Sequence, residues 1–234
     1  MNEKVYGRNL VAETLKLGRV RKVWCLPGHP FLKEVKEAKI PYEISDRRKL
    51  DQLSHSGNHQ GIVAEAEAYP LYEVEDMLKE KDGLLVILDG LKDPQNLGAI
   101  LRTVDCAGAD GVIFKKHNSV KLNATAAKVS CGAIEYVKAA EVTNLVQTIK
   151  KLKEKGYWIL AADAGGTSAY DEMKYDMNVA LVIGAEGEGI SRLVKEQCDF
   201  VVSLPMKGHL DSLNASVAAG ILIYQIVSER SHRG

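Results

Sequence analysis

The stretch Leu84-Leu85-Val86-Ile87-Leu88, followed after a short loop by Asp93-Pro94-Gln95-Asn96-Leu97-Gly98-Ala99-Ile100-Leu101-Arg102-Thr103, is the strongest indication of fold in this chain. Its first part is an uninterrupted apolar run, which is typical of a strand buried on both faces of a parallel sheet. Its second part carries polar side chains where a core would want none. Loops at the carboxyl ends of such strands are where α/β folds keep their ligand sites. The stretch therefore predicts a buried strand that leads into a site.

Two later stretches repeat this arrangement. The apolar run Val179–Ile183 leads into Gly184-Ala185-Glu186-Gly187-Glu188-Gly189. The run Phe200–Leu204 leads into Pro205-Met206-Lys207-Gly208-His209-Leu210-Asp211-Ser212-Leu213-Asn214-Ala215-Ser216. Three strand ends that carry Asn, Arg, Glu, Ser and Gly favour an active site. A dinucleotide site of the Rossmann type is not favoured, because the G-x-G-x-x-G spacing is absent after Leu88.

From Leu84 onward, strands alternate with helices, which predicts an α/β fold with a mostly parallel sheet and helices on both faces. The expected strands are 84–88, 111–114, 134–138, 157–162, 179–183 and 200–204, and the expected helices are 97–107, 123–129, 143–155, 190–197 and 214–228.

The first seventy residues predict a small, separate α/β unit. Its expected helices are Gly7–Leu17, Phe31–Ala38 and Arg47–Leu53, and its expected strands are Lys22–Leu26, Tyr42–Ile44 and Ile62–Glu67. We place the domain boundary near Pro70. The expected organisation is a small α/β domain (1–69), an acidic linker with a helix around Val74–Lys81 (70–83), and a larger α/β domain that carries the three polar stretches (84–234).

Two helices carry further information. In the helix after the first strand, Leu97, Ile100, Leu101 and Val104 form one apolar stripe, and Arg102 lies about 140° from Leu97, so it is free to face a ligand. The last helix, 214–228, has almost no polar face. We expect it to be buried all round, either in the domain core or against a second subunit.

Composition narrows the class of protein. The formal net charge is zero, but residues 1–54 hold twelve Lys and Arg against seven Asp and Glu, so a basic N-terminal module could attract phosphates. The longest apolar run is far too short for a membrane span, and the N-terminus lacks the apolar segment of a secretory signal. The four scattered cysteines favour reduced thiols in the cytoplasm over disulfides or zinc.

The three site stretches together resemble the SpoU/TrmH branch of the SPOUT family of RNA 2′-O-methyltransferases. That family shows D-P-x-N-x-G-x-x-x-R-T, G-x-E-G-x-G and P-M-x-G-x-x-x-S-L-N-x-S in this order, and all three motifs occur here. Tyr6-Gly7-Arg8-Asn9-Leu10-Val11 resembles the start of the small substrate-binding domain of many members. The stretches 59–64 and 122–133 resemble the RlmB-like subgroup, which methylates a guanosine ribose in 23S ribosomal RNA.

The resemblance implies a deep C-terminal trefoil knot, a homodimer formed through helices at this end of the fold, and S-adenosylmethionine as the cofactor, without a metal. By position in the motifs, the main chain of Gly184, Leu204 and Leu213 would contact that cofactor. For the two leucines, plain core packing is the alternative.

The residues that we expect in catalysis are Asn96, Arg102, Glu186, Ser212 and Asn214. Arginine offers a rigid fork of donors for a phosphate or a nascent oxyanion, and it stays protonated, so we assign it positioning rather than proton abstraction. Asn96, Ser212 and Asn214 could instead cap helices. Glu186 could orient Arg102 or a backbone amide. The sequence leaves the general base open.

For RNA contacts we expect Arg8 and Asn9, His59 and Gln60 in an exposed loop at 54–61, and Lys115 and Lys116 in a basic patch. His209 is a lone loop histidine, for which a surface position or an RNA contact is favoured over catalysis. His55 and His59 do not predict a metal pair. The alternatives to 23S ribosomal RNA are transfer RNA, another ribosomal site, or a non-catalytic RNA-binding or ribosome-assembly protein.

Overall fold

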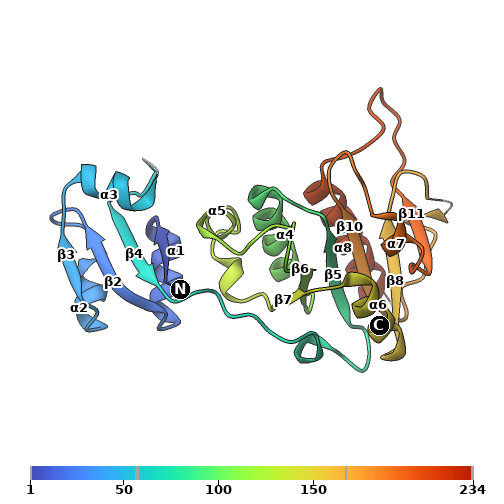
Figure 1. The fold of residues 1–234 in the computed structure, drawn as a ribbon, viewed down its shortest axis with the longest axis horizontal. Helices are drawn as coiled ribbons and strands as arrows, with labels where there is room; N and C mark the ends of the chain where they lie inside the picture. Colours follow the sequence, from blue (N-terminus) through green and yellow to red (C-terminus); the bar gives the residue numbers. More distant parts are fainter. Residues whose placement is uncertain (1, 56–57, 167, 233–234) are drawn as a thin grey trace. The chain divides into compact units, whose positions relative to one another are not determined.

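The computed structural model describes residues 2–55, 58–166 and 168–232. The chain forms two compact units, coloured along the chain in Figure 1. The first unit holds Met1–Tyr69 together with Leu122–Tyr136, and the second holds Pro70–Lys121 together with Val137–Gly234. The sequence predicts a division near Pro70, but it places residues 122–136 in the larger α/β domain, whereas the structure packs them with the N-terminal residues.

The first unit is a four-stranded sheet in the order β1-β4-β2-β3. Its third and fourth strands in this order run parallel, and the other pairs are antiparallel. Its elements are β1 (Glu3–Tyr6), α1 (Arg8–Lys16), β2 (Val20–Cys25), α2 (Leu32–Glu37), β3 (Tyr42–Ile44), α3 (Arg47–Ser54) and β4 (Ile62–Ala66). The strand β1 is not predicted by the sequence, because charged residues interrupt its short apolar pattern and its pairing partner lies about sixty residues away.

The segment 122–136 contributes α5 (Ala124–Val129) and a 3-10 turn, η2 (Ala133–Glu135), to this unit. Glu135 forms an ion pair with Arg19, whose guanidinium also lies over the ring of Tyr69, 4.2 Å from its centroid. The Thr14 hydroxyl donates to the same carboxylate at 2.9 Å. The predicted strand at 134–138 is therefore wrong, because the chain turns at Gly132 (φ 95°) and buries Glu135 against Arg19.

The second unit is a seven-stranded sheet in the order β7-β6-β5-β10-β8-β11-β9. Every strand pair in it is parallel, as the sequence predicts. Its strands are β5 (Leu84–Asp89), β6 (Gly111–Lys115), β7 (Ala139–Val142), β8 (Tyr157–Ala162), β9 (Ser168–Ala169), β10 (Asn178–Gly184) and β11 (Phe200–Ser203). The strand β10 comes late in the sequence, but it lies in the middle of the sheet, between β5 and β8.

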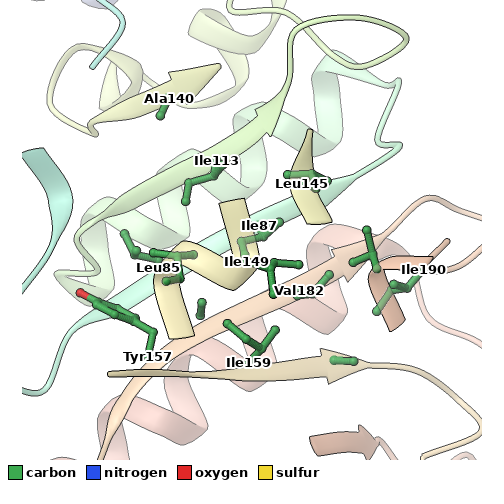
Figure 2. Close-up of a cluster of buried hydrophobic side chains, with 14 of the residues drawn as sticks. Leu85, Ile87, Ile113, Ala140, Leu145, Ile149, Tyr157, Ile159, Val182 and Ile190 are labelled. Carbon is green, nitrogen blue, oxygen red and sulfur yellow. The ribbon is translucent and has the colours of Figure 1, made fainter. Parts of the chain in front are cut away.

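Helices cover both faces of this sheet, which confirms the predicted fold class. They are α4 (Pro94–Ala107), α6 (Leu145–Glu154), α7 (Arg192–Lys195) and α8 (Ala215–Ser231). Figure 2 shows the core on one face, where Leu145 and Ile149 of α6 pack onto Leu85 and Ile87 of β5. Side chains along a strand point alternately to the two faces of a sheet, so the neighbours of Leu85 and Ile87 in β5 face the other way. On that opposite face, α8 packs on β10 and against α4.

One local prediction differs from the structure, and another, the burial of the last helix in the domain core or against a second subunit, is met within one chain on one face only. In place of a helix over Val74–Lys81 there is one 3-10 turn, η1 (Val74–Met77), after which the chain is extended at Leu78. The helix α8 is not buried all round within one chain. Its Val217, Ile221 and Tyr224 are exposed, because α4 and the sheet cover only the face that carries Ala219, Leu222, Ile223 and Ile226.

Across the part of the chain that the structure describes, we find no helix with the length and apolar character to cross a bilayer.

The buried pair Arg19–Glu135 generates a stability prediction. The Glu135 side chain is 1% exposed, so Glu135→Gln leaves Arg19 buried without its counter-charge. Breaking such a pair costs about 3–5 kcal/mol of unfolding free energy. We expect a loss of this size in denaturant unfolding followed by Trp24 fluorescence, with Trp158→Phe as the common background. The control in the same unit is Glu67→Gln, whose partner Arg21 is more than half exposed, and it should cost less than about 1 kcal/mol. Equal losses in the two variants would contradict the prediction.

Candidate active site

A cavity of about 690 Å³ lies at the carboxyl ends of β8, β10 and β11. The second and third motif stretches both line it, through the predicted residues Gly184, Glu186, Leu204, Ser212, Leu213 and Asn214. Leu213 is 40% exposed and Leu204 is half buried, so neither is an ordinary core leucine. Two of the three strand ends that the sequence singles out therefore meet at one cavity.

The glycine loop after β10 is folded tightly onto itself. The backbone groups of Ala185 and Gly189 exchange two hydrogen bonds, of 3.1 and 2.9 Å. A Cβ at Gly184 would collide with the backbone of Gly189, so close approach of two chain segments requires glycine there. The closed loop presents Glu186 to the cavity.

Three side chains from the three motifs form one polar cluster. The Asn96 amide donates to Glu186 Oε1 at 2.9 Å, and the Asn214 amide donates to Asn96 Oδ1 at 2.9 Å and to the same Glu186 oxygen. Asn96 is only 5% exposed. The cluster holds the carboxylate in a fixed position at the cavity wall.

The helix-capping alternatives are resolved residue by residue. Asn214 does cap α8, since its Oδ1 accepts from the backbone N–H groups of Ser216 (2.9 Å) and Val217 (3.3 Å). The cap of α4 is Asp93, which accepts from Gln95 N at 2.9 Å, and Asn96 lies within that helix. The Glu186 carboxylate accepts its hydrogen bonds from the side-chain amides of Asn96 and Asn214.

Two other predicted catalytic residues lie further out. Ser212 is exposed at the cavity rim, and its hydroxyl is 3.5 Å from Asp211 Oδ1. Arg102 is exposed on α4, and it is not among the described residues that line the cavity. His209 is exposed in the same loop as Ser212.

A buried carboxylate that sequence reasoning misses ties the loops together. Asp89, 2% exposed at the end of β5, accepts at Oδ2 from the backbone N–H (2.8 Å) and the hydroxyl (2.6 Å) of Ser191. Its Oδ1 lies 2.7 Å from Lys115 Nζ. Burial raises the pKa of Asp89, but the hydrogen bonds from Lys115 and Ser191 outweigh burial and hold that pKa below its usual value. An acidic residue that ends an apolar strand is the signal that could have identified it.

This network engages one of the lysines that the sequence predicts as an RNA contact. The Lys115 ammonium pairs with Asp89 at the end of β6, and its role in RNA binding stays a prediction. Lys116 is exposed, as expected. Lys121, five residues further along the chain, pairs with Glu141 at 2.7 Å.

In the first unit, Arg8, Asn9 and Gln60 are exposed and come together, since Gln60 Oε1 accepts from the Arg8 backbone N–H at 2.9 Å. The prediction that His59 is exposed is wrong, because the residue is only 3% exposed. Its Nδ1 accepts from Gly61 N at 2.9 Å, and its Nε2 is 3.1 Å from Asp51 Oδ1. His59 therefore supports the loop from inside. Residues 56 and 57 of the predicted exposed loop lie outside the described residues.

Within the described ranges, no group of three or more His, Cys, Asp or Glu side chains has an arrangement that could hold a metal ion.

Comparison with known proteins gives consistent results for both units. Residues 83–224 match the model of the SpoU rRNA Methylase family, and residues 4–72 match the model for RNA 2'-O ribose methyltransferase substrate binding. A protein of Staphylococcus haemolyticus (strain JCSC1435) named as a TrmH family tRNA/rRNA methyltransferase is 44% identical over 98% of this chain and 97% of its own. One of Bacillus subtilis (strain 168), named likewise, is 42% identical over 100% and 98%.

Among solved structures, the SpoU methyltransferase AviRb from Streptomyces viridochromogenes, crystallised with the cofactor AdoMet, superimposes with a TM-score of 0.87. The two chains are 23% identical, and the match covers 98% of this chain and 91% of AviRb. This likeness shows a shared fold over both units.

The Asp89 network generates a pH-dependent prediction. We expect Asp89→Asn to lower the unfolding free energy at pH 7 by about 1–3 kcal/mol, because Lys115 loses its charged partner. A depressed folded-state pKa contributes stability above the unfolded-state value of about 4, and this contribution is lost as the pH falls through the folded-state pKa. The difference between wild type and variant, measured by denaturant unfolding, should therefore shrink below pH 4. A difference that stays constant from pH 7 to pH 3 would contradict this origin.

Proposed function

Because this chain belongs to the SpoU rRNA methylase family of RNA methyltransferases, we propose that it methylates the 2′-hydroxyl of a guanosine ribose in 23S ribosomal RNA, in the peptidyl-transferase region, with S-adenosylmethionine as the methyl donor. The observation that carries the proposal is the hydrogen-bonded cluster of Asn96, Glu186 and Asn214, of which Glu186 and Asn214 line the cavity. The match to the substrate-binding model over 4–72 and the RlmB-like stretches at 59–64 and 122–133 support an RNA substrate of the ribosomal type.

The cavity fits the proposed cofactor in size and charge. Its volume of about 690 Å³ is within the range of small-molecule sites. The charged side chains among its described lining residues are all acidic, namely Asp163, Glu186, Glu188 and Asp211. Such a lining suits a cationic sulfonium. The main chain at Gly184, Leu204 and Leu213 would hold the nucleoside.

The residues of the chain would act by placement and electrostatics. When bound, the cofactor would supply a methyl group activated by its positively charged sulfur, which the ribose oxygen would accept as it loses its proton. Arg102 would stabilise the negative charge that develops on that oxygen or hold the adjacent phosphate. Ser212 and the amide groups of Asn96 and Asn214 would orient the ribose and keep Glu186 in place.

The first unit would provide most of the contacts that bind the RNA. Arg8, Asn9 and Gln60 form its exposed polar cluster, and residues 1–54 carry the basic excess. Lys116 of the second unit would add a phosphate contact. His59 would act indirectly, by supporting the loop that presents Gln60.

We also propose a cytoplasmic homodimer, with the trefoil knot of the SPOUT family. The support for the dimer is the apolar, exposed stripe Val217, Ile221 and Tyr224 on α8, which a second copy could cover. Sedimentation of a monomer at micromolar concentration would contradict the dimer.

The target is tested by transfer of a radioactive methyl group to unmodified transcripts of 23S ribosomal RNA, 16S ribosomal RNA and transfer RNA. A ribose 2′-O-methyl group blocks alkaline cleavage of the next bond, so the labelled nucleotide can be mapped directly. We expect label in one guanosine of 23S ribosomal RNA. Label in transfer RNA would support the other substrate class that the names of the relatives include. Cofactor binding without transfer to any transcript would favour a non-catalytic RNA-binding protein.

Arg102→Ala separates cofactor binding from transfer. Arg102 is exposed on α4 and lies outside the described cavity lining, so the affinity for S-adenosylmethionine should change less than about twofold. Methyl transfer should fall about a hundredfold to a thousandfold, the usual effect of removing one preorganised donor. The matched control is Arg192→Ala on α7, whose guanidinium pairs with Glu196 at the surface. Near-normal turnover of the Arg102 variant would remove this residue from the mechanism.

A further inference from the structure

Asp163 follows β8 directly, at the edge of the sheet where the cavity lies. Its backbone is fixed on both sides: Asp163 N donates to Val202 O at 3.0 Å, and Gly166 N donates to Asp163 O at 3.0 Å. The residue lines the cavity with its side chain 21% exposed. Asp163 is thus a rigidly held carboxylate in the wall of the cavity.

The two oxygens of this carboxylate have different surroundings. Oδ1 accepts from Gly165 N at 2.9 Å and lies 2.9 Å from Lys195 Nζ. Oδ2 points the other way, and it is 4.0 Å from the position that a Cβ on Gly189 would occupy. The hydrogen bond from Lys195 lowers the pKa of Asp163, so the group is ionised at neutral pH. Among the described residues, the hydrogen bonds to this side chain all end on Oδ1, which leaves Oδ2 as an acceptor that faces the glycine loop.

The wall opposite Oδ2 is suited to a sugar ring. Gly189 has a φ of 66° and no side chain, so a ligand can approach the backbone closely there. In dinucleotide-binding α/β folds of another type, an acidic side chain near the carboxyl ends of the parallel strands accepts a hydrogen bond from a ribose hydroxyl, which shows that a carboxylate can play this part. A vicinal diol offers two donors to one carboxylate oxygen or to the pair.

We propose that Asp163 is a specificity-determining residue for the cofactor, and that its Oδ2 accepts hydrogen bonds from the ribose hydroxyls of S-adenosylmethionine. This inference rests on the proposed use of that cofactor. Lys195 and Gly165 hold the carboxylate in the orientation that directs Oδ2 into the cavity. The residue then selects a ribonucleoside and takes no part in methyl transfer itself.

The test is calorimetry of the full chain with two ligands, S-adenosylmethionine and 5′-methylthioadenosine, which keeps the ribose and lacks the amino-acid group. For Asp163→Asn we expect affinity for both ligands to fall by about tenfold to a hundredfold, because a hydrogen bond to a charged group is lost. Unchanged affinity would overturn the proposal. A loss confined to S-adenosylmethionine would also overturn it, because the contact would then be with the amino-acid end.

Two further variants separate binding from folding. Lys195→Gln breaks the same ion pair but keeps the carboxylate and its hydrogen bond from Gly165 N, which is enough to hold its orientation, so its affinities should stay within about threefold of wild type. A loss as large as that of Asp163→Asn would show that the ion pair matters and Oδ2 does not. Asp171→Asn, an exposed aspartate of the same unit outside the cavity lining, is the matched control and should bind both ligands normally. If wild type bound no S-adenosylmethionine, the proposed function would fail and the role of Asp163 with it.

Discussion

The arrangement of the site depends on one side chain, Asn214, whose two ends serve different elements. Its oxygen caps α8 by accepting from Ser216 N and Val217 N, while its nitrogen donates to Asn96 and Glu186. Because capping fixes the oxygen, the direction of the nitrogen is fixed as well. The single amide of Asn214 therefore fixes three elements relative to one another, namely the start of α8, the inner side of α4 and the glycine loop. An aspartate here could cap the helix equally well, but it could not donate to Glu186.

The parallel sheet supplies the frame in which that amide can act. β10 lies between β5 and β8, so its glycine loop meets the ends of strands from both halves of the sheet. Asp89 fixes this loop from the β5 side through Ser191, and Asp163 lies on the β8 side. Two buried or half-buried carboxylates thus flank the loop, and each is held by a lysine. Of the two, Asp163 lines the cavity itself.

Much of this could be predicted from the sequence because it is encoded locally. The apolar runs 84–88, 179–183 and 200–204 each become a strand of the sheet, and the polar stretches after them meet at one site. What could not be predicted depends on contacts between residues far apart in the chain. The sequence predicts a surface cation at Lys115, but the structure shows its ion pair with Asp89. The sequence predicts an exposed loop residue at His59, but the structure shows its ring in contact with Asp51 and Gly61. Strand β1 is likewise defined by its pairing with β4 rather than by its own pattern.

The first unit is assembled from two stretches of chain, with more than fifty residues of the second unit between them. During synthesis, residues 1–69 leave the ribosome well before Glu135, so Arg19 has no counter-charge until the later segment emerges. Domains commonly fold in order from the N-terminus as the chain is made. Here the N-terminal unit cannot reach its final packing first, because its last piece is translated only after β5 and β6 of the other unit. Because of this order of translation, the first unit can be completed only after the first strands of the second unit's sheet have been synthesised.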